Sequence, residues 1–180
     1  MTPKNKTIAA LYISPRSIYK TMSDVDPWDP ERDATKWPGG TPAVLHPPCG
    51  QWARLRAQAH HNPEEKALGL IAVEQVKQWG GVLEHPNAST LWKTAGLPPP
   101  NSYDDQGGFT IQVDQLHWGH KARKSTWLYI FGTERKNIPS PPILLSYPET
   151  TIGQMSRTGR AATPPEFARW LVDIAKTCAA

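Results

Sequence analysis

The segment from residue 43 to residue 85 constrains the fold more than any other part of the chain. It holds two short apolar runs, "AVLH" (43–46) and "VLEH" (82–85), and proline ends each of them: Pro47 and Pro48 after the first, Pro86 after the second. Both runs are therefore expected to be short buried strands. A helical pattern lies between them, and a strand–helix–strand unit of this kind crosses over right-handedly, which makes its two strands parallel.

The helix in this unit is marked at both ends. Asn62 suits the cap, Pro63 suits the first helical position, two glutamates follow, and Gly80 supplies the stop. The expected buried stripe repeats at helical spacing. It consists of Leu68, Ile71, Ala72, Val76 and Trp79.

The remaining segments complete an α/β pattern. Four further strands are expected at residues 7–13, 109–115, 125–132 and 143–147. Residues 14–42 contain five prolines and are expected to be loop with at most a short helix. The chain is expected to end in a helix over 163–177, with Thr163 as cap and Glu166 completing a capping box.

These elements predict one α/β domain over residues 1–180. It would combine a strand and a Pro-rich loop (1–42), the β-α-β unit (43–85) and the C-terminal helix (163–177). The expected architecture is a Rossmann-like three-layer fold with a mostly parallel sheet.

Charge and apolar patterning narrow the environment. The chain has 20 Lys plus Arg against 16 Asp plus Glu, a mild excess that permits a polyanionic partner without requiring one. No apolar stretch approaches the roughly 20 residues of a bilayer helix, and the start "MTPKNKT" lacks the core of a signal peptide. We therefore expect a cytoplasmic protein with no membrane partner. Cys49 and Cys178 lie far apart, so no disulfide framework is indicated.

The chemistry is expected beyond the carboxyl ends of the parallel strands, where ligands bind in open sheets. Cys49 follows one strand and Glu84 lies in the next, so the two should be neighbours in one cleft. Cys49 is either a nucleophile, with Arg54, Arg56 or His85 lowering its pKa, or a small residue in a proline turn.

The chain contains, in this order, "HPPCGQW", "VLEHP", "WGHKARKSTWLYIFG" and "RTGRAATPPEFARWLVDIA". These four segments resemble segments of DNA cytosine-5 methyltransferases, phage-encoded ones in particular. "HPPCGQW" resembles their Pro-Cys nucleophile loop and "VLEHP" their strand-end glutamate segment. "WGHKARKSTWLYIFG" and "RTGRAATPPEFARWLVDIA" are similar to a later strand and to the closing arginine loop and helix.

The resemblance implies a reduced class I methyltransferase core and a transferase that acts on cytosine in DNA, in the host cytoplasm if a phage encodes it. Cys49 would add to C6 of a flipped-out cytosine, and Glu84 would grip N3 and the exocyclic amine, where a carboxylic acid can protonate N3. The other expected substrate-binding residues are Pro48, His85, Arg157 and Arg160.

The cofactor is the open part of this expectation. S-adenosylmethionine is implied by the resemblance, but "LYISPRSIYK" has no glycine after the first strand, and the Gln-x-Arg-x-Arg motif and a target-recognition domain are missing. Asp29, with Glu31 and Asp33, offers carboxylates for a ribose or stays a solvated loop. Two alternatives therefore stand: a catalytically degenerate module that binds nucleic acid or a host protein, and modification of a nucleotide without S-adenosylmethionine.

Basic residues indicate where a nucleic acid would lie. The segment "HKARK", together with Arg135 and Lys136, forms the densest basic cluster, and Trp118 or Trp127 could stack on bases; a solvated loop is equally compatible. The expected contacts are Arg54, Arg56, His120, Lys121, Arg123 and Lys124.

The expected partner is DNA or a nucleotide, with a partner protein or a second copy of the chain also possible. No metal is expected, because paired cysteine spacing is absent. The histidines and cysteine that a metal would need are hydrogen-bonded loop residues in the favoured reading. They are His46, Cys49, His85, His117 and His120.

Overall fold

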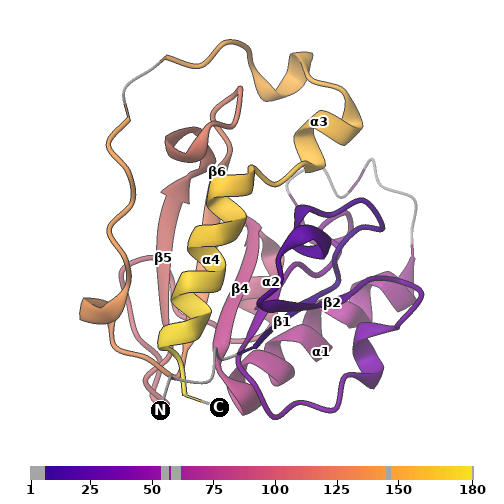
Figure 1. The fold of residues 1–180 in the computed structure, drawn as a ribbon, viewed down its shortest axis with the longest axis vertical. Helices are drawn as coiled ribbons and strands as arrows, with labels where there is room; N and C mark the ends of the chain where they lie inside the picture. Colours follow the sequence, from indigo (N-terminus) through magenta and orange to yellow (C-terminus); the bar gives the residue numbers. More distant parts are fainter. Residues whose placement is uncertain (1–6, 54–56, 58–61, 145–146, 180) are drawn as a thin grey trace.

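A computed structural model describes residues 7–53, 57, 62–144 and 147–179, and it contains one six-stranded sheet (Figure 1). The strand order is β2-β1-β3-β4-β6-β5. The strands are β1 (Ile8–Leu11), β2 (Val25–Trp28), β3 (Ala43–Leu45), β4 (Gly81–Pro86), β5 (Phe109–Asp114) and β6 (Ser125–Phe131).

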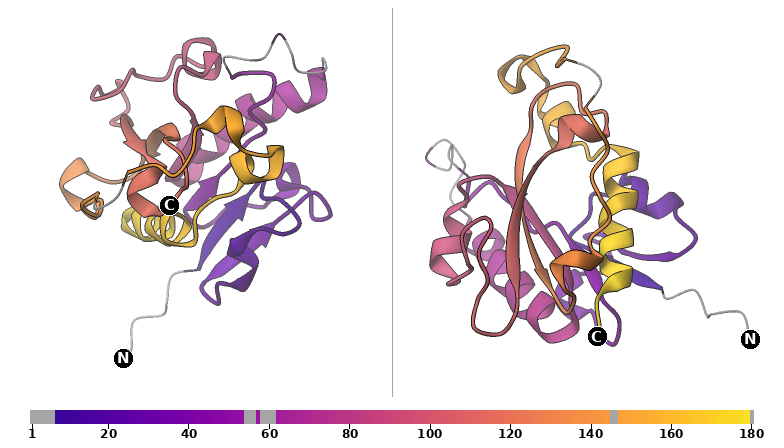
Figure 2. Two further views of the ribbon diagram at one scale, coloured as in Figure 1. Left: turned by 90° about the horizontal axis from the view of Figure 1, so that it is seen from above. Right: turned by 90° about the vertical axis from the view of Figure 1, so that its left-hand side faces the viewer.

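Helices cover both faces of this sheet, so the molecule has three layers. The α-helices are α1 (Pro63–Trp79), α2 (Thr90–Thr94), α3 (Arg157–Ala161) and α4 (Pro165–Thr177). Figure 2 shows α4 on one face and α1 with α2 on the other. Each face has its own apolar core, because neighbouring strand residues point to opposite sides. Short 3-10 turns connect these elements: η1 (Ile18–Thr21), η2 (Ala34–Lys36), η4 (Gln115–Trp118), η5 (Arg135–Asn137) and η6 (Ile152–Gln154).

The expected crossover unit is confirmed. β3 and β4 pair in parallel with Val44 opposite Val82, and α1 connects them. The neighbouring pairs β1–β2 and β1–β3 are parallel too. β6 runs antiparallel between β4 and β5, so the sheet is mixed, with its parallel part at β2, β1, β3 and β4. The carboxyl ends of β4 and β5 therefore lie at the same edge as the start of β6.

The cap and stop signals of α1 are confirmed, but its buried face is rotated. The Asn62 side chain accepts a hydrogen bond from the Glu65 backbone N–H at 3.1 Å, and the helix ends before Gly80. The buried face contains Gly69, Ala72, Val73 and Val76, whereas Ile71 is 37% exposed. The apolar residues outnumber the positions that contact the sheet, so the spacing alone did not select the right stripe.

Gly81 explains why β4 begins where it does. Its φ is +125°, and a Cβ there would lie 1.9 Å from the Ala43 carbonyl oxygen of β3. Only glycine allows this backbone approach, which brings β4 directly beside β3.

Two expectations about loops and strands were wrong. Residues 14–42 contain β2, whose Pro27 is tolerated because β2 is an edge strand. Residues 143–147 do not form the expected strand: Ile143 is 83% exposed and Tyr147 is exposed, while 145–146 lie outside the described residues. Residues 143–147 cannot pair with β6, the strand that precedes them, because β4 and β5 occupy both of its sides. The prolines around 143–147 also remove backbone donors that a strand would need.

The cap of the last helix was also assigned wrongly. Pro164, not Thr163, is the N-cap of α4, and no side chain caps the helix. Pro165 occupies the first helical position, where its missing N–H costs nothing. Within the described part of the chain, no helix has the length and apolar character needed to cross a membrane.

One aspartate connects α4 to the segment that leads into β2. Asp24, just before β2, accepts hydrogen bonds from Arg169 Nη1 at 2.8 and 3.0 Å and from Lys176 Nζ at 2.6 Å. The hydrogen bonds from Lys176 and Arg169 lower the pKa of Asp24 to about 2. The Asp24 side chain is 13% exposed, so the interaction is poorly screened by solvent.

Replacing Asp24 by asparagine is expected to lower the free energy of unfolding by about 1–3 kcal/mol, because two cations lose a charged acceptor. A depressed pKa means that the contribution is complete above the unfolded value of 3.8 and is lost as the pH falls toward 2. Urea unfolding at pH 7 and pH 2.5 measures the difference. The control is Asp173→Asn, which removes only an exposed contact with Lys176; an equal loss in both variants would contradict the assignment.

Candidate functional site

The candidate site lies at the edge of the sheet where the parallel strands end. His46 and Cys49 follow β3, and Glu84 lies near the end of β4. Gln115 follows β5, and Thr126 lies at the start of β6, which the antiparallel pairing brings to the same edge. Tyr19 reaches this edge from η1, which follows β1.

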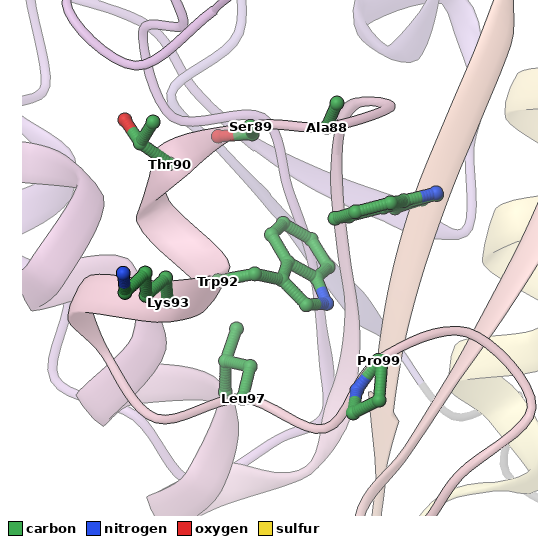
Figure 3. A pocket seen from close by; sticks show the side chains of 8 residues that line it. Ala88, Ser89, Thr90, Trp92, Lys93, Leu97 and Pro99 are labelled. Carbon is green, nitrogen blue, oxygen red and sulfur yellow. The ribbon is translucent and has the colours of Figure 1, made fainter.

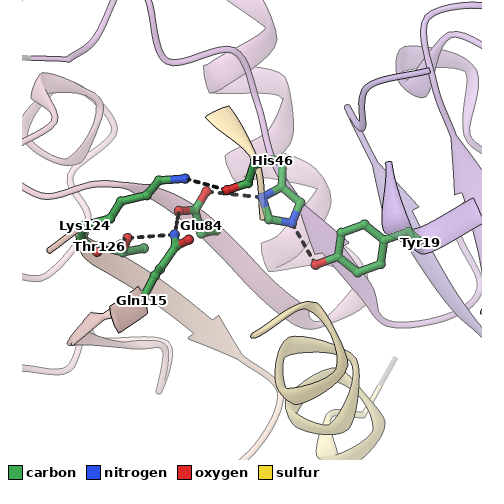
Figure 4. Close-up of polar contacts among 7 residues, drawn as sticks. Tyr19, His46, Glu84, Gln115, Lys124 and Thr126 are labelled. Atoms are coloured by element: carbon green, nitrogen blue, oxygen red, sulfur yellow. Dashed lines mark hydrogen bonds and ion pairs between the residues drawn. The ribbon is translucent and has the colours of Figure 1, made fainter. Parts of the chain in front are cut away.

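The Glu84 carboxylate is held by hydrogen-bond donors on both oxygens (Figure 4). His46 Nδ1 lies 3.2 Å from Oε2, and Gln115 Nε2 donates to Oε1 at 3.0 Å. The His46 backbone N–H donates to the Leu11 carbonyl at 3.0 Å, which fixes the ring beside β1. Glu84 is thus held from β3 on one side and from the end of β5 on the other.

These contacts keep Glu84 ionised. Burial by itself would raise the pKa of Glu84, but the hydrogen bond and charge of His46, followed by the charge of Lys124, outweigh it and lower the pKa to about 2. Its side chain is 12% exposed. At neutral pH, Glu84 is therefore a nearly buried anion that accepts hydrogen bonds and does not itself supply a proton.

The orientation of the Gln115 amide follows from its partners. The Thr126 hydroxyl donates to the Lys124 carbonyl at 3.1 Å, and the Glu84 carboxylate only accepts. Both groups need a donor, and Gln115 Nε2 serves both, at 3.0 Å each. Gln115 Oε1 is consequently turned away and is buried without a hydrogen-bond partner among the described residues. An unpaired buried acceptor is costly unless a ligand or water satisfies it.

Cys49 shares this site with Glu84. The residue is exposed, whereas its sulfur is partly desolvated. This desolvation raises the pKa of the Cys49 thiol, the Glu84 charge raises it further, and the Lys124 charge opposes them. Cys49 follows β3 and Glu84 lies near the end of β4, so both residues belong to the edge where these parallel strands end. Of the groups expected to lower this pKa, Arg54 and Arg56 lie outside the described residues; among the described residues, the cation that acts in that direction is Lys124.

The His85 side chain lies on the face of the sheet opposite the Glu84 side chain. His85 follows Glu84 in β4, so its side chain points to the α2 side, where Nδ1 pairs with the Ser89 hydroxyl at 2.7 Å. Burial lowers the pKa of His85 to about 4, while the carbonyls of Pro47 and Pro48 act against that shift. His85 is therefore neutral at pH 7. His85 Nε2 is buried without a hydrogen-bond partner among the described residues, and Pro48 is half-buried.

The basic residues do not form one cluster. Lys124 is half-buried at the site edge and donates to the Ala162 carbonyl at 3.4 Å, which places the end of α3 beside it. Lys121 and Arg123 are exposed nearby, whereas His120 is buried against the Ala122 carbonyl at 2.7 Å. His120 is therefore not available to a nucleic acid as the structure stands.

The remaining predicted cations fall into three groups. Arg135 and Lys136 follow β6, about 20 Å of strand from its start, and pair with Asn101 and Glu134. Arg157 and Arg160 belong to α3, with Arg160 exposed. Arg54 and Arg56 lie outside the described residues.

A separate hollow of about 370 Å³ opens on the α2 face of the sheet (Figure 3). Trp127 lies next to Thr126 in β6 and points the opposite way, so this hollow and the Glu84 carboxylate are on different faces. Its wall is largely aromatic and apolar, with Lys93 at its side; it consists of Ala88, Ser89, Thr90, Trp92, Lys93, Leu97, Pro99 and Trp127. Trp118 is 6% exposed and packs against Phe167 and Trp170, so little of its ring is open to a base.

The residues after β1 and β2 do not fit S-adenosylmethionine. η1 occupies the position after β1, and its Tyr19 is fully buried and bonded to His46 at 2.9 Å. Asp29 after β2 is buried and already paired with Lys20 and with the backbone N–H of Glu31. Asp33 is bonded to Thr35 and paired with Lys36, whereas Glu31 is exposed. Residues 12–24, which follow β1, contain no glycine to form a cradle. In the described ranges, no group of three His, Cys, Asp or Glu side chains is arranged to hold a metal ion.

Comparison with known proteins adds no identity: no family model matches the chain, and no curated protein matches it.

Sequence reasoning missed the groups that surround Glu84. His46 was considered only as a metal ligand, and Tyr19, Gln115 and Thr126 were not singled out. A usable signal was available for two of them, since His46 and Gln115 each come directly after a strand that ends at the site edge. Tyr19 depends on how η1 folds back over β1, which the local sequence does not specify.

The coupling between Cys49 and Glu84 predicts the reactivity of the thiol. Glu84→Gln removes a negative charge that raises the thiol pKa, so Cys49 should be alkylated faster at pH 7.5; Lys124→Met should slow it. The measurement is the pH dependence of iodoacetamide labelling, resolved by peptide mass spectrometry. Cys178, which is 1% exposed, is the internal control and should stay unlabelled in the folded protein. If neither variant changed the rate of Cys49 alkylation, the thiol would not be coupled electrostatically to Glu84 or to Lys124.

Proposed function

We propose that the protein binds a cytosine or related pyrimidine base, in DNA or as a nucleotide, between Cys49 and Glu84 and modifies it through the thiol. The observation that carries this proposal is the pairing of an exposed thiol with a buried, doubly held carboxylate at one edge of the sheet. Ligands of open α/β sheets bind at this edge.

The acceptor groups favour an aminopyrimidine. The Glu84 carboxylate accepts hydrogen bonds, and the unpartnered Oε1 of Gln115 lies on the side chain that holds it. Cytosine with a proton on N3 presents two adjacent donors, the N3–H and the exocyclic amine, whereas uracil and thymine present a carbonyl oxygen in place of that amine. A pair of donors matches a carboxylate edge, so the site favours cytosine over its oxo counterparts.

The chemistry that this arrangement supports is addition of the Cys49 thiol to C6. A bond forms between Sγ and C6, the C5–C6 double bond shifts toward C4, and the electron pair displaced from the C4–N3 double bond ends on N3. The thiol proton passes to solvent, and N3 takes a proton from solvent, so the addition is neutral overall. The Glu84 anion stabilises the protonated N3 by accepting its hydrogen bond. Glu84 does not donate the proton, which revises the role expected from the sequence.

The fold supports the methyltransferase-like expectation at the level of architecture. An antiparallel strand inserted between two parallel ones near one end of the sheet, as β6 is between β4 and β5, is also the arrangement of the class I methyltransferase core. We therefore propose a reduced Rossmann-like core of this kind. No step of the proposed chemistry passes through S-adenosylmethionine, since the residues after β1 and β2 do not fit it.

The second candidate is a module that binds nucleic acid or a protein without chemistry. The hollow beside Trp127 and Lys93 favours it, because indole faces and a lysine suit a base and its phosphate. Calorimetry separates the two candidates. Binding of short DNA that is unaffected by Cys49→Ser and Glu84→Gln but weakened by Trp127→Leu would favour the module.

Trapping tests the leading proposal. The wild-type protein is expected to form a covalent adduct with an oligonucleotide carrying a pyrimidine analogue that is activated toward addition at C6, and intact-protein mass spectrometry detects it. Cys49→Ser should abolish the adduct, and Glu84→Gln should slow it by at least about tenfold. Cys178→Ala is the matched control and should leave the adduct intact. An adduct that survives Cys49→Ser would refute the role of the thiol.

A further inference from the structure

The side chains of Tyr19 and His46 meet where the loops of the sheet diverge. β1 pairs with β2 on one side and with β3 on the other, so the segments that leave β1 and β3 part at this point. Tyr19 comes from the segment after β1 and His46 from the one after β3. The Tyr19 hydroxyl and His46 Nε2 lie 2.9 Å apart, with ring centroids 5.4 Å apart, and Figure 4 shows this bond in line with the one to Glu84.

The positions of the protons in this chain follow from its two ends. Glu84 is ionised and can only accept, so His46 Nδ1 must carry a hydrogen toward Oε2. Burial, and then the charge of Glu84, raise the pKa of Tyr19 far above its ordinary value, so the phenol keeps its hydrogen. When His46 holds one ring proton, Tyr19 therefore donates to Nε2, and the ring is fixed as the Nδ1–H tautomer.

We propose that Tyr19 and His46 are positioning residues for Glu84: Tyr19 donates to Nε2 and fixes the plane of the His46 ring, and the Nδ1–H of that ring holds Oε2. The effect is to fix the carboxylate so that its accepting edge is ready for the base. This inference rests on the proposed function only in so far as Glu84 binds a pyrimidine.

The other described charged and titratable groups around the His46 ring do not donate to Glu84 Oε2. His85 is close enough to interact with His46 electrostatically, but its own ring bonds Ser89 on the opposite face. Lys124 acts on Glu84 through its charge, whereas its Nζ donates to the Ala162 carbonyl. Gln115 holds the other oxygen of Glu84 and does not contact Oε2. The Oε2 atom thus depends on the His46 N–H.

The tautomer is directly measurable. Long-range ¹H–¹⁵N spectra of the wild-type protein at pH 8 should show His46 protonated on Nδ1 and not on Nε2. Tyr19→Phe keeps the ring that fills the core but removes the hydroxyl that donates to Nε2, so the Nδ1–H tautomer that Glu84 requires should persist while the Nε2 ¹⁵N resonance moves. An Nε2–H tautomer in the wild-type protein, or an Nε2 resonance that does not move in Tyr19→Phe, would overturn the proposal whether or not the protein binds pyrimidines.

Two substitutions of His46 separate positioning from a general packing role. Asparagine places an amide near Nδ1 and can still donate to Glu84, whereas glutamine reaches the Nε2 position and can contact only Tyr19. The dissociation constant of deoxycytidine monophosphate should rise about tenfold or more in His46→Gln but less than about threefold in His46→Asn. Circular dichroism and thermal melting verify that both variants fold.

The outcomes of this binding test remain distinct. Equal weakening in both variants would mean that His46 contributes packing and not a directed N–H, and equal retention would mean that Oε2 needs no donor. Absence of binding in the wild-type protein would count against the proposed function, and the tautomer spectra would then decide on the positioning role alone.

Discussion

The structure of the site depends on one buried negative charge. A carboxylate that is 12% exposed is strongly destabilised unless donors surround it, and Glu84 obtains them from His46 and Gln115, which belong to different segments. Those donors can converge only if β3 lies beside β4 and the end of β5 lies at the same edge. The contacts of the Glu84 charge therefore depend on the order of the strands. Loss of that order would leave Glu84 as an unpaired buried ion.

Two different devices hold the edge together. Backbone geometry brings the strands close, as at Gly81, where any Cβ would collide with the Ala43 carbonyl. Side chains then connect the diverging loops, through the bond between Tyr19 and His46 and the link from Lys124 to the Ala162 carbonyl. The Tyr19–His46 bond joins the segment after β1 to the residue that follows β3.

The sequence predicted correctly the features that depend on residues close together in the chain, such as the ends of helices and strands. Asn62, Pro63 and Gly80 determined α1, and the prolines after residues 46 and 85 determined the ends of β3 and β4, which placed Cys49 and Glu84 at one edge. β2 was missed because its pairing with β1 overrides the weak strand propensity of a segment with Pro27. Tyr19 could not be predicted, since its contact depends on how η1 folds back over β1; the position of Gln115 after a strand was a usable signal, but its contact with Glu84 depends on the antiparallel β6.

The central claim is that one flat aminopyrimidine lies between the Cys49 sulfur and the Glu84 carboxylate. A crystal structure of the protein with a cytosine deoxynucleotide tests it most directly. The account predicts the amine edge of the base on Glu84 and C6 facing the Cys49 Sγ, with the Tyr19–His46 bond intact. A base seated instead in the hollow between Trp92 and Trp127, with Glu84 free of ligand, would contradict it.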